Sequence, residues 1–186
     1  PISGNLEEAL FLIQDPLFIS KNNENELIEL DVEYGLIEYQ DGWPFTNTDK
    51  IIGAPAIEDL DQNGEYEVIF SDYSGRVYIT DRFGTLLNYF DTGDHIWGSP
   101  SIMDIDFDGL KEIVITSKDQ HLYILDHQAT LLLDYDAGQY LLGTPAIGNL
   151  DSDEDMEIIF GGYSTDGKLF AINKIRIMRI MRELKF

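Results

Sequence analysis

The sequence contains no cysteine, which excludes disulfide bonds, thiol catalysis and thiolate metal sites. It also has no run of 18 apolar residues, so no membrane-spanning helix is expected. No signal peptide is recognisable, and the chain opens at Pro1 rather than Met. A processed product or an excised piece is the simplest explanation. There is no Asn-X-Ser/Thr sequon, so N-glycosylation is not predicted.

Basic residues are scarce. There are 12 Lys and Arg against 35 Asp and Glu, for a formal net charge of -23. A chain this acidic repels phosphate groups, and nucleic-acid binding is therefore disfavoured. The hydrophobic content of 44% over 186 residues predicts a folded chain with a sizeable core rather than a disordered one.

What the sequence does contain is a repeat. Gly-Ala-Pro-Ala-Ile-Glu-Asp-Leu-Asp begins at Gly53, Gly-Ser-Pro-Ser-Ile-Met-Asp-Ile-Asp at Gly98, and Gly-Thr-Pro-Ala-Ile-Gly-Asn-Leu-Asp at Gly143, so the starts lie 45 residues apart. Residues 53–97 and 98–142 align without a gap. A fixed period of about 40 to 50 residues built from short strands predicts a β-propeller.

Each repeat reads as four strands joined by hairpin-length turns. In the second copy these are residues 99–105, 112–116, 121–125 and 130–135. Residues 113–115 are apolar in succession, whereas a sheet with one wet face should alternate apolar and polar residues. Such a run indicates a sheet covered on both faces, as in blades stacked around an axis. A two-sheet sandwich ranks second.

The predicted fold is therefore all-β, with propeller-type blades of four antiparallel strands and about four blade repeats, and the chain could be a fragment of a larger propeller. We expect a single propeller-type domain over residues 1–186. Its parts are a divergent blade (1–52), two full blades (53–97 and 98–142), a partial blade (143–173) and an atypical basic tail (174–186).

The tail carries apolar residues at helical spacing and five of the 12 basic residues. One interpretation is a basic amphipathic helix that docks on a membrane or an acidic surface. The other is a helix that covers an exposed edge of the last blade.

The polar loop of each repeat resembles a calcium-binding loop. Calcium takes six to eight hard oxygen ligands, and a tight loop supplies them from side chains at positions 1, 3 and 5, a carbonyl at 7 and a closing acid, with Gly at 6 for the turn. Here the closing acid falls at position 9, and the third loop has Glu154 instead of Gly, so we expect it to bind most weakly. The predicted ligands are Asp59, Asp61, Asn63, the Glu65 carbonyl and Glu67; Asp104, Asp106, Asp108, the Leu110 carbonyl and Glu112; and Asn149, Asp151, Asp153, the Asp155 carbonyl and Glu157.

Other metals fit these loops less well. An all-oxygen ligand set disfavours zinc and copper, and magnesium prefers to keep its waters. An EF-hand is disfavoured because strands rather than helices flank the loops, and because its closing acid stands at position 12.

From Asp104 the chain reads Asp-Ile-Asp-Phe-Asp-Gly-Leu-Lys-Glu-Ile-Val-Ile, and Gly-Ser-Pro-Ser-Ile begins at Gly98. This resembles the FG-GAP or VCBS-type repeat, the blade of integrin α-subunit-like propellers, over Trp43 to about Asn173. The resemblance implies calcium at one end of the propeller, ligand contacts at the other, and an extracellular or cell-surface location. Such propellers usually have about seven blades, so this chain is a fragment, a small four-bladed ring or half of a dimeric ring.

The predicted ligand contacts lie where one blade passes to the next and between the second and third strands. With the resemblance, both places fall at the end opposite the calcium loops. Aromatic side chains there could stack on sugars or anchor a protein; the alternative is packing between blades, above all for Trp97, which shares its repeat position with Ile52 and Leu142. The candidates are Tyr73, Asp94, His95, Trp97, Tyr140 and Tyr163.

No catalytic motif stands out. His95, His121 and His127 have no metal-ligand spacing, and the last two share repeat positions with basic residues, which predicts surface turns. A Gly-X-Ser-X-Gly elbow and a Gly-rich phosphate loop are both missing. We expect a non-catalytic, calcium-binding module for adhesion or for a glycan or protein ligand, which could self-associate to complete a propeller. The alternative is the propeller segment of an extracellular lyase or glycosidase, since paired carboxylates abound.

Overall fold

The structure, a computed structural model, describes residues 39–47, 49–151, 153 and 155–173. These residues lie in one compact unit that begins at Tyr39. Most of the predicted divergent blade over 1–52 and the whole predicted tail over 174–186 fall outside the described residues. Within the described ranges the secondary-structure elements are all β-strands. These ranges therefore contain no helix long and apolar enough to cross a membrane.

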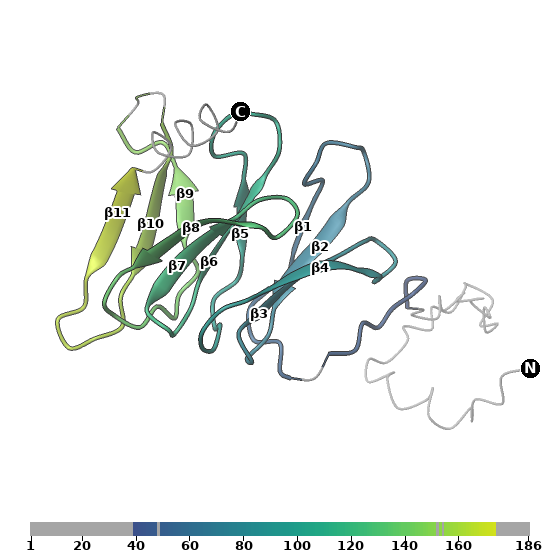
Figure 1. The fold of residues 1–186 in the computed structure, drawn as a ribbon, viewed down its shortest axis with the longest axis horizontal. Coiled ribbons are helices and arrows are strands. Elements are labelled where there is room, and N and C mark those ends of the chain that lie inside the picture. Colours follow the sequence, from purple (N-terminus) through teal and green to yellow (C-terminus); the bar gives the residue numbers. More distant parts are fainter. Residues whose placement is uncertain (1–38, 48, 152, 154, 174–186) are drawn as a thin grey trace, which may run out of the picture. The chain divides into compact units, whose positions relative to one another are not determined.

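The strands form three antiparallel sheets, one for each repeat (Figure 1). This confirms the all-β, propeller-type prediction. The first sheet contains β1 (Ala56–Glu58), β2 (Glu67–Ser71), β3 (Arg76–Thr80) and β4 (Leu86–Asp91), in that order. The second contains β5 (Ser101–Met103), β6 (Glu112–Thr116), β7 (His121–Leu125) and β8 (Leu131–Asp136). The third contains β9 (Ala146–Gly148), β10 (Glu157–Gly161) and β11 (Leu169–Asn173).

The consecutive apolar residues are explained by burial on both faces of the second sheet. Ile113 and Ile115 of β6 belong to the core shared with the first sheet, whereas Val114 belongs to the core shared with the third. All three side chains are fully buried. Successive residues of a strand point to opposite faces, so an unbroken apolar run is what a sheet between two others requires.

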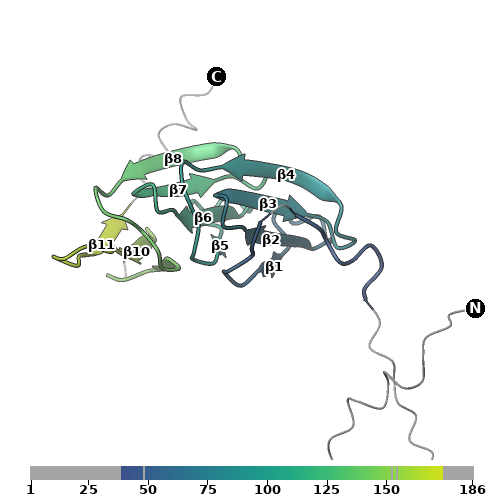
Figure 2. The same ribbon diagram turned by 90° about the horizontal axis from the view of Figure 1, so that it is seen from below.

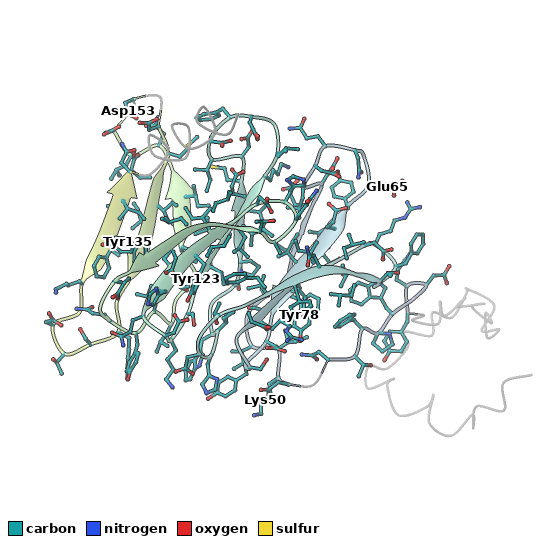
Figure 3. All side chains as sticks on the ribbon, viewed as in Figure 1. Lys50, Glu65, Tyr78, Tyr123, Tyr135 and Asp153 are labelled. Atoms are coloured by element: carbon teal, nitrogen blue, oxygen red, sulfur yellow. The ribbon has the colours of Figure 1, made fainter. Side chains whose placement is uncertain are left out.

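An aromatic side chain from each of the first two repeats packs against the next sheet. Phe90 of β4 lies 5.3 Å from the ring of Tyr123, and Tyr135 of β8 lies 6.0 Å from that of Phe160. Phe45 occupies the corresponding place before the first sheet, with ring centroids 5.3 Å from Phe70. Figure 3 shows Tyr123 and Tyr135 within the body of the sheets. The contact therefore recurs with the sequence repeat, since Phe45, Phe90 and Tyr135 are 45 positions apart.

The Gly that opens each of the first two repeats lies against the Gly that opens the next repeat. A Cβ added to Gly53 would stand 2.6 Å from the carbonyl oxygen of Gly98, and one added to Gly98 would stand 2.8 Å from that of Gly143. Next to this seam the N–H of Ser99 donates to Oγ1 of Thr144 at 2.9 Å. Only glycine permits this approach, and the seam runs beside the short strands β1, β5 and β9, which contact one another in series. Figure 2 shows β4 and β8 along the opposite, outer side.

Candidate functional site

The acidic loops follow the first strand of each sheet and bring three of the predicted acids together in each repeat; Glu112, predicted to close the second loop, is not in its group. In each of three groups, one ligand atom per residue lies within 4.8 Å of the others. In Figure 3, Glu65 of the first loop and Asp153 of the third lie at the same end of the sheets, opposite Lys50. The groups are Asp59, Asp61 and Glu67; Asp104, Asp106 and Asp108; and Asp151, Asp153 and Glu157.

The first aspartate of each of the first two loops holds the backbone turn. The carboxylate of Asp104 accepts the N–H groups of Asp108 and Gly109 at 3.1 and 2.9 Å, and Asp59 accepts the N–H of Gly64 at 2.9 Å. Gly64 and Gly109 have φ values of +90° and +94°, the left-handed region that favours glycine. The requirement for Gly at loop position 6 is therefore met as the sequence predicted.

The structure adds a feature that the sequence analysis missed. Gln62 and Phe107, at loop position 4, also adopt left-handed conformations, with φ of 57° and 60°. Non-glycine residues rarely adopt this conformation, and neither residue type signals it. The only available signal was their shared place within the repeat.

The closing glutamates are held in the same way three times. The Oε2 atom of each accepts the backbone N–H of the residue seven positions earlier: Leu60 to Glu67 at 3.0 Å, Ile105 to Glu112 at 2.8 Å and Leu150 to Glu157 at 2.6 Å. The three side chains are buried. Among the described residues, the buried Oε1 atoms of Glu112 and Glu157 have no hydrogen-bond partner.

A buried carboxylate oxygen without a partner is costly. Burial raises the pKa of Glu112 to about 7, and the nearby charges of Asp106, Asp108 and Asp104 act in the same direction, against the hydrogen bond from Ile105. Burial likewise raises the pKa of Glu67, and Asp61 and Asp59 add to the effect. A divalent cation among the loop carboxylates opposes the repulsion between these charges. In the third loop, where Glu157 belongs to the group, it would also give the buried oxygen a partner. The donor set therefore fits a hard cation such as calcium.

The third loop departs from the other two. Asn149 stands where they have Asp, and its Nδ2 donates to the carbonyl oxygen of Asp153 at 2.5 Å. In the first loop, position 5 is Asn63, whose Oδ1 accepts the N–H of Glu65 at 2.7 Å. The carbonyl ligands expected at Glu65, Leu110 and Asp155 lie on these loops and stay predictions.

At the other end a single backbone hydrogen bond recurs at three junctions between repeats. The N–H groups of Tyr73, Lys118 and Tyr163 donate to the carbonyls of Lys50, His95 and Tyr140 at 2.8, 2.9 and 2.7 Å. These residues are equivalent positions of successive repeats. The bond fixes the turn between the second and third strands against the preceding repeat, whatever side chains the two residues carry.

The predicted ligand residues fall into two groups along these junctions. Tyr73 stacks on His95 with ring centroids 3.9 Å apart and lies 6.1 Å from Trp97, between the first and second repeats. Tyr140 and Tyr163 pair through their backbones at the next junction. The structure thus brings Tyr73, His95 and Trp97 together at one junction and pairs Tyr140 with Tyr163 at the next.

Two lysines belong to this end and were missed in the sequence. Lys118 lies 3.4 Å from the carboxylate of Asp94, and Lys50 lies 5.1 Å from the ring centroid of Tyr73. The hydrogen bond from the N–H of His95 and the charge of Lys118 hold the pKa of Asp94 below its usual range. The sequence could have indicated them, because Lys118 has the repeat position of Tyr163 and Lys50 that of Tyr140.

No known protein family and no curated protein matches this sequence. Solved structures of β-propeller-type proteins are similar to it, including the following three. The N-terminal part of BBS1, in a complex with ARL6, is 12% identical with a TM-score of 0.50 over 68% of this chain and 38% of that one. BamB from Moraxella catarrhalis is 17% identical, with a TM-score of 0.47 over 68% and 34%. The C-terminal domain of Pseudomonas aeruginosa PilY1 is 19% identical, with a TM-score of 0.48 over 61% and 28%.

The chain thus spans about a third of the length of the structures it matches. Identities this low bear on the fold alone. The likeness to the BBS1 structure agrees with the three stacked antiparallel sheets seen here, and the chain has the fold of part of a β-propeller.

Proposed function

We propose that this chain is a non-catalytic, calcium-binding β-propeller module of the FG-GAP or VCBS type. One observation carries the proposal. Each of three equivalent loops ends at a buried glutamate, one oxygen of which accepts the backbone N–H of the residue seven positions earlier. In two of the loops the other oxygen is buried without a partner among the described residues. A merely solvated acidic surface needs neither this regularity nor this burial.

The side chains that would hold calcium are the three groups of acids already described. When bound, the ion supplies positive charge among carboxylates that otherwise repel one another. The chain's own part is to set the oxygens in place: Asp59 and Asp104 shape the turns, and the closing glutamates join each loop to its second strand. The ion would thereby join the first two strands of each blade.

Calcium should stabilise the fold. Extracellular modules of this kind bind calcium at roughly 0.1 to 1 mM. Ligand at ten times its dissociation constant adds about 1.4 kcal/mol per site, so three independent sites would add about 4 kcal/mol. The melting temperature should rise by several degrees in millimolar calcium and fall with a chelator, as measured by calorimetry.

Screening is the competing explanation, because salt alone weakens the self-repulsion of a chain with net charge -23. The control is sodium chloride at matched ionic strength, together with magnesium at the same concentration as calcium. If sodium chloride raises the melting temperature as much as calcium does, the calcium sites are refuted.

The module's role, in this proposal, is adhesion or ligand binding at the cell surface or outside the cell. The proposed location rests on the resemblance to FG-GAP or VCBS-type repeats, and sites of millimolar affinity would be filled there. The same fold could serve as the propeller segment of a polysaccharide-degrading enzyme. Polysaccharide cleavage by the longest natural chain that contains these repeats would favour that second function. We also propose that copies associate to complete the propeller.

A further inference from the structure

A cavity of about 640 Å³ opens at the junction between the second and third repeats. It lies at the end bearing the recurrent backbone hydrogen bond. Figure 3 shows Lys50, whose carbonyl accepts one of these bonds, at the end opposite Glu65 and Asp153 of the acidic loops. None of its side chains is charged, in a chain with 35 acidic residues. The side chains that line it are Gln120, Gln139, Tyr140, Tyr163, Ser164 and Thr165.

Two tyrosines form one aromatic wall of this cavity. Tyr140 and Tyr163 are antiparallel bridge partners, joined by the 2.7 Å hydrogen bond, and directly opposed residues of an antiparallel pair project to the same face. Tyr140 is 46% exposed and Tyr163 is 67% exposed. Such rings offer a flat apolar surface with a hydroxyl at its tip.

The preceding junction provides an internal comparison. There Asp94 and Lys118 form an ion pair at 3.4 Å, and the ring of Tyr73 is covered by His95. At the cavity the equivalent positions of Asp94 and Lys118 hold Gln139 and Tyr163, both neutral. At the cavity the ammonium of Lys118 lies 5.8 Å from the ring centroid of Tyr140, the repeat equivalent of the contact between Tyr73 and His95. The ring with the most open surface at this junction is therefore that of Tyr163.

An insertion shapes the cavity and holds its amide group. Thr165 and Asp166 have no counterpart in the first two repeats, and Thr165 lines the cavity. Asp166 accepts a hydrogen bond from Nε2 of the buried Gln139 at 3.1 Å and another from Oγ of Ser164 at 2.5 Å. The hydrogen bond from Ser164 and the neighbouring Lys168 lower the pKa of Asp166, so it stays an acceptor at neutral pH.

We propose that this cavity binds a neutral saccharide, with a pyranose ring stacked on Tyr163 and Tyr140 and its hydroxyls bonded to the surrounding amide and hydroxyl groups. Ligand sites of this size combine apolar walls with a few placed polar groups. The lining side chains carry no charge, and the ammonium of Lys118 beside the ring of Tyr140 is already paired with Asp94. The inference rests on the proposed ligand-binding function and narrows it to one junction and one ligand class.

The test uses the full chain in millimolar calcium with named probes. These are the hexaoses of cellulose, xylan, starch and chitin as neutral ligands, and polygalacturonate and a tyrosine-rich peptide library as the comparison. At least one neutral hexaose should bind by calorimetry. Tyr163→Ala and Tyr140→Ala should each weaken it about tenfold, the loss of one aromatic contact of about 1.4 kcal/mol. Tyr163→Phe should retain most of the affinity.

Tyr73→Ala is the matched control, because Tyr73 has the same repeat position as Tyr163 but is stacked on His95. It should bind the hexaose as the unaltered chain does, and the melting temperatures of all variants should agree within a few degrees. The inference is overturned if no neutral hexaose binds, if only the acidic polymer or the peptides bind, or if Tyr73→Ala weakens binding as much as Tyr163→Ala does. Calcium-dependent melting is read separately, so either proposal can fail while the other stands.

Discussion

At the scale of single residues, His121 is a side chain whose charge acts on the fold itself. It begins β7, and its Nδ1 atom is hydrogen-bonded to the carboxylate of Asp134 on β8. This bond raises the pKa of His121; partial burial opposes it, and the charges of Asp134, Asp119 and Asp136 add to it. The protonated imidazole therefore holds the third and fourth strands of the second blade together.

The sign of the pH dependence follows from the raised pKa. His121 stabilises the fold fully below its unfolded pKa of about 6.5 and loses this contribution as pH rises through the higher folded value. His121→Gln should therefore lower the melting temperature at about pH 5.5 and change it little at about pH 9. The effect should be small, because the two side chains are 30% and 45% exposed.

A double-mutant cycle identifies the partner. In the Asp134→Asn background, His121→Gln should have little pH-dependent effect, since the carboxylate is already gone. A melting difference that is the same from pH 5.5 to 9, or one that survives in that background, would assign the stabilisation to packing against Tyr123, whose ring lies 5.8 Å away.

At the scale of elements, the three loops should differ in calcium affinity. The second loop has three aspartates and Gly109. It is also tied to the first blade, because the N–H of Lys111 donates to the carbonyl of Leu60 at 2.9 Å and its ammonium is paired with Glu58. The third loop has Asn149 in place of the first aspartate and no glycine. We therefore expect the second loop to bind most tightly and the third most weakly.

Asp106 and Asp151 have the same loop position, so each serves as the control for the other. Asp106→Ala should abolish one calcium site and lower the melting temperature in calcium by about 2 to 5 °C, the effect of losing about 1.4 kcal/mol in a chain of this size. Asp151→Ala should cost less, and the two variants should melt alike in chelator. Calorimetry in which Asp151→Ala loses the tighter site would reverse the ranking.

The elements also show how far the sequence could predict the fold. Residues 112–116 and 121–125 coincide with β6 and β7, because β-branched runs between turn signals are strong local information. The first strand is shorter than the predicted 99–105, covering Ser101–Met103. Gly98 and Ser99 instead contact the equivalent residues of the third repeat, and Pro100 has no N–H to donate to a ladder.

Within the candidate site, what could be predicted was likewise what local spacing determines. The carboxylates at loop positions 1, 3 and 5 of the second repeat converge as expected. The pairing of Lys118 with Asp94 and the cavity beside Tyr163 arise only when separate repeats are stacked. No local sequence pattern specifies which side chains of adjacent repeats then meet. The insertion at Thr165 could be related to the cavity only once the structure showed that this residue lines it.

At the scale of the whole molecule, one face of the third sheet lacks the cover that its counterparts have. Val114 and Leu122, on the face of the second sheet toward the third, are fully buried. The equivalent residues of the third sheet are Ile159, which is half-buried, and Leu169, which is 78% exposed. Among the described residues no further sheet covers this face, although its composition is that of a sheet between two others.

The same stacking occurs twice in this structure, so the surface that best fits this face is another sheet of the same kind. If copies of the chain supply it, as proposed, they should associate at micromolar concentration, and Leu169→Lys should disrupt the association. Burying one leucine is worth about 1.5 to 3 kcal/mol, so the dissociation constant should rise at least tenfold in sedimentation equilibrium. Leu131→Lys, at a leucine 44% exposed on the outer strand β8, is the control and should change nothing. Self-association is refuted if the unaltered chain stays monomeric across the concentration range, and this face is refuted as the interface if both lysine variants weaken association equally.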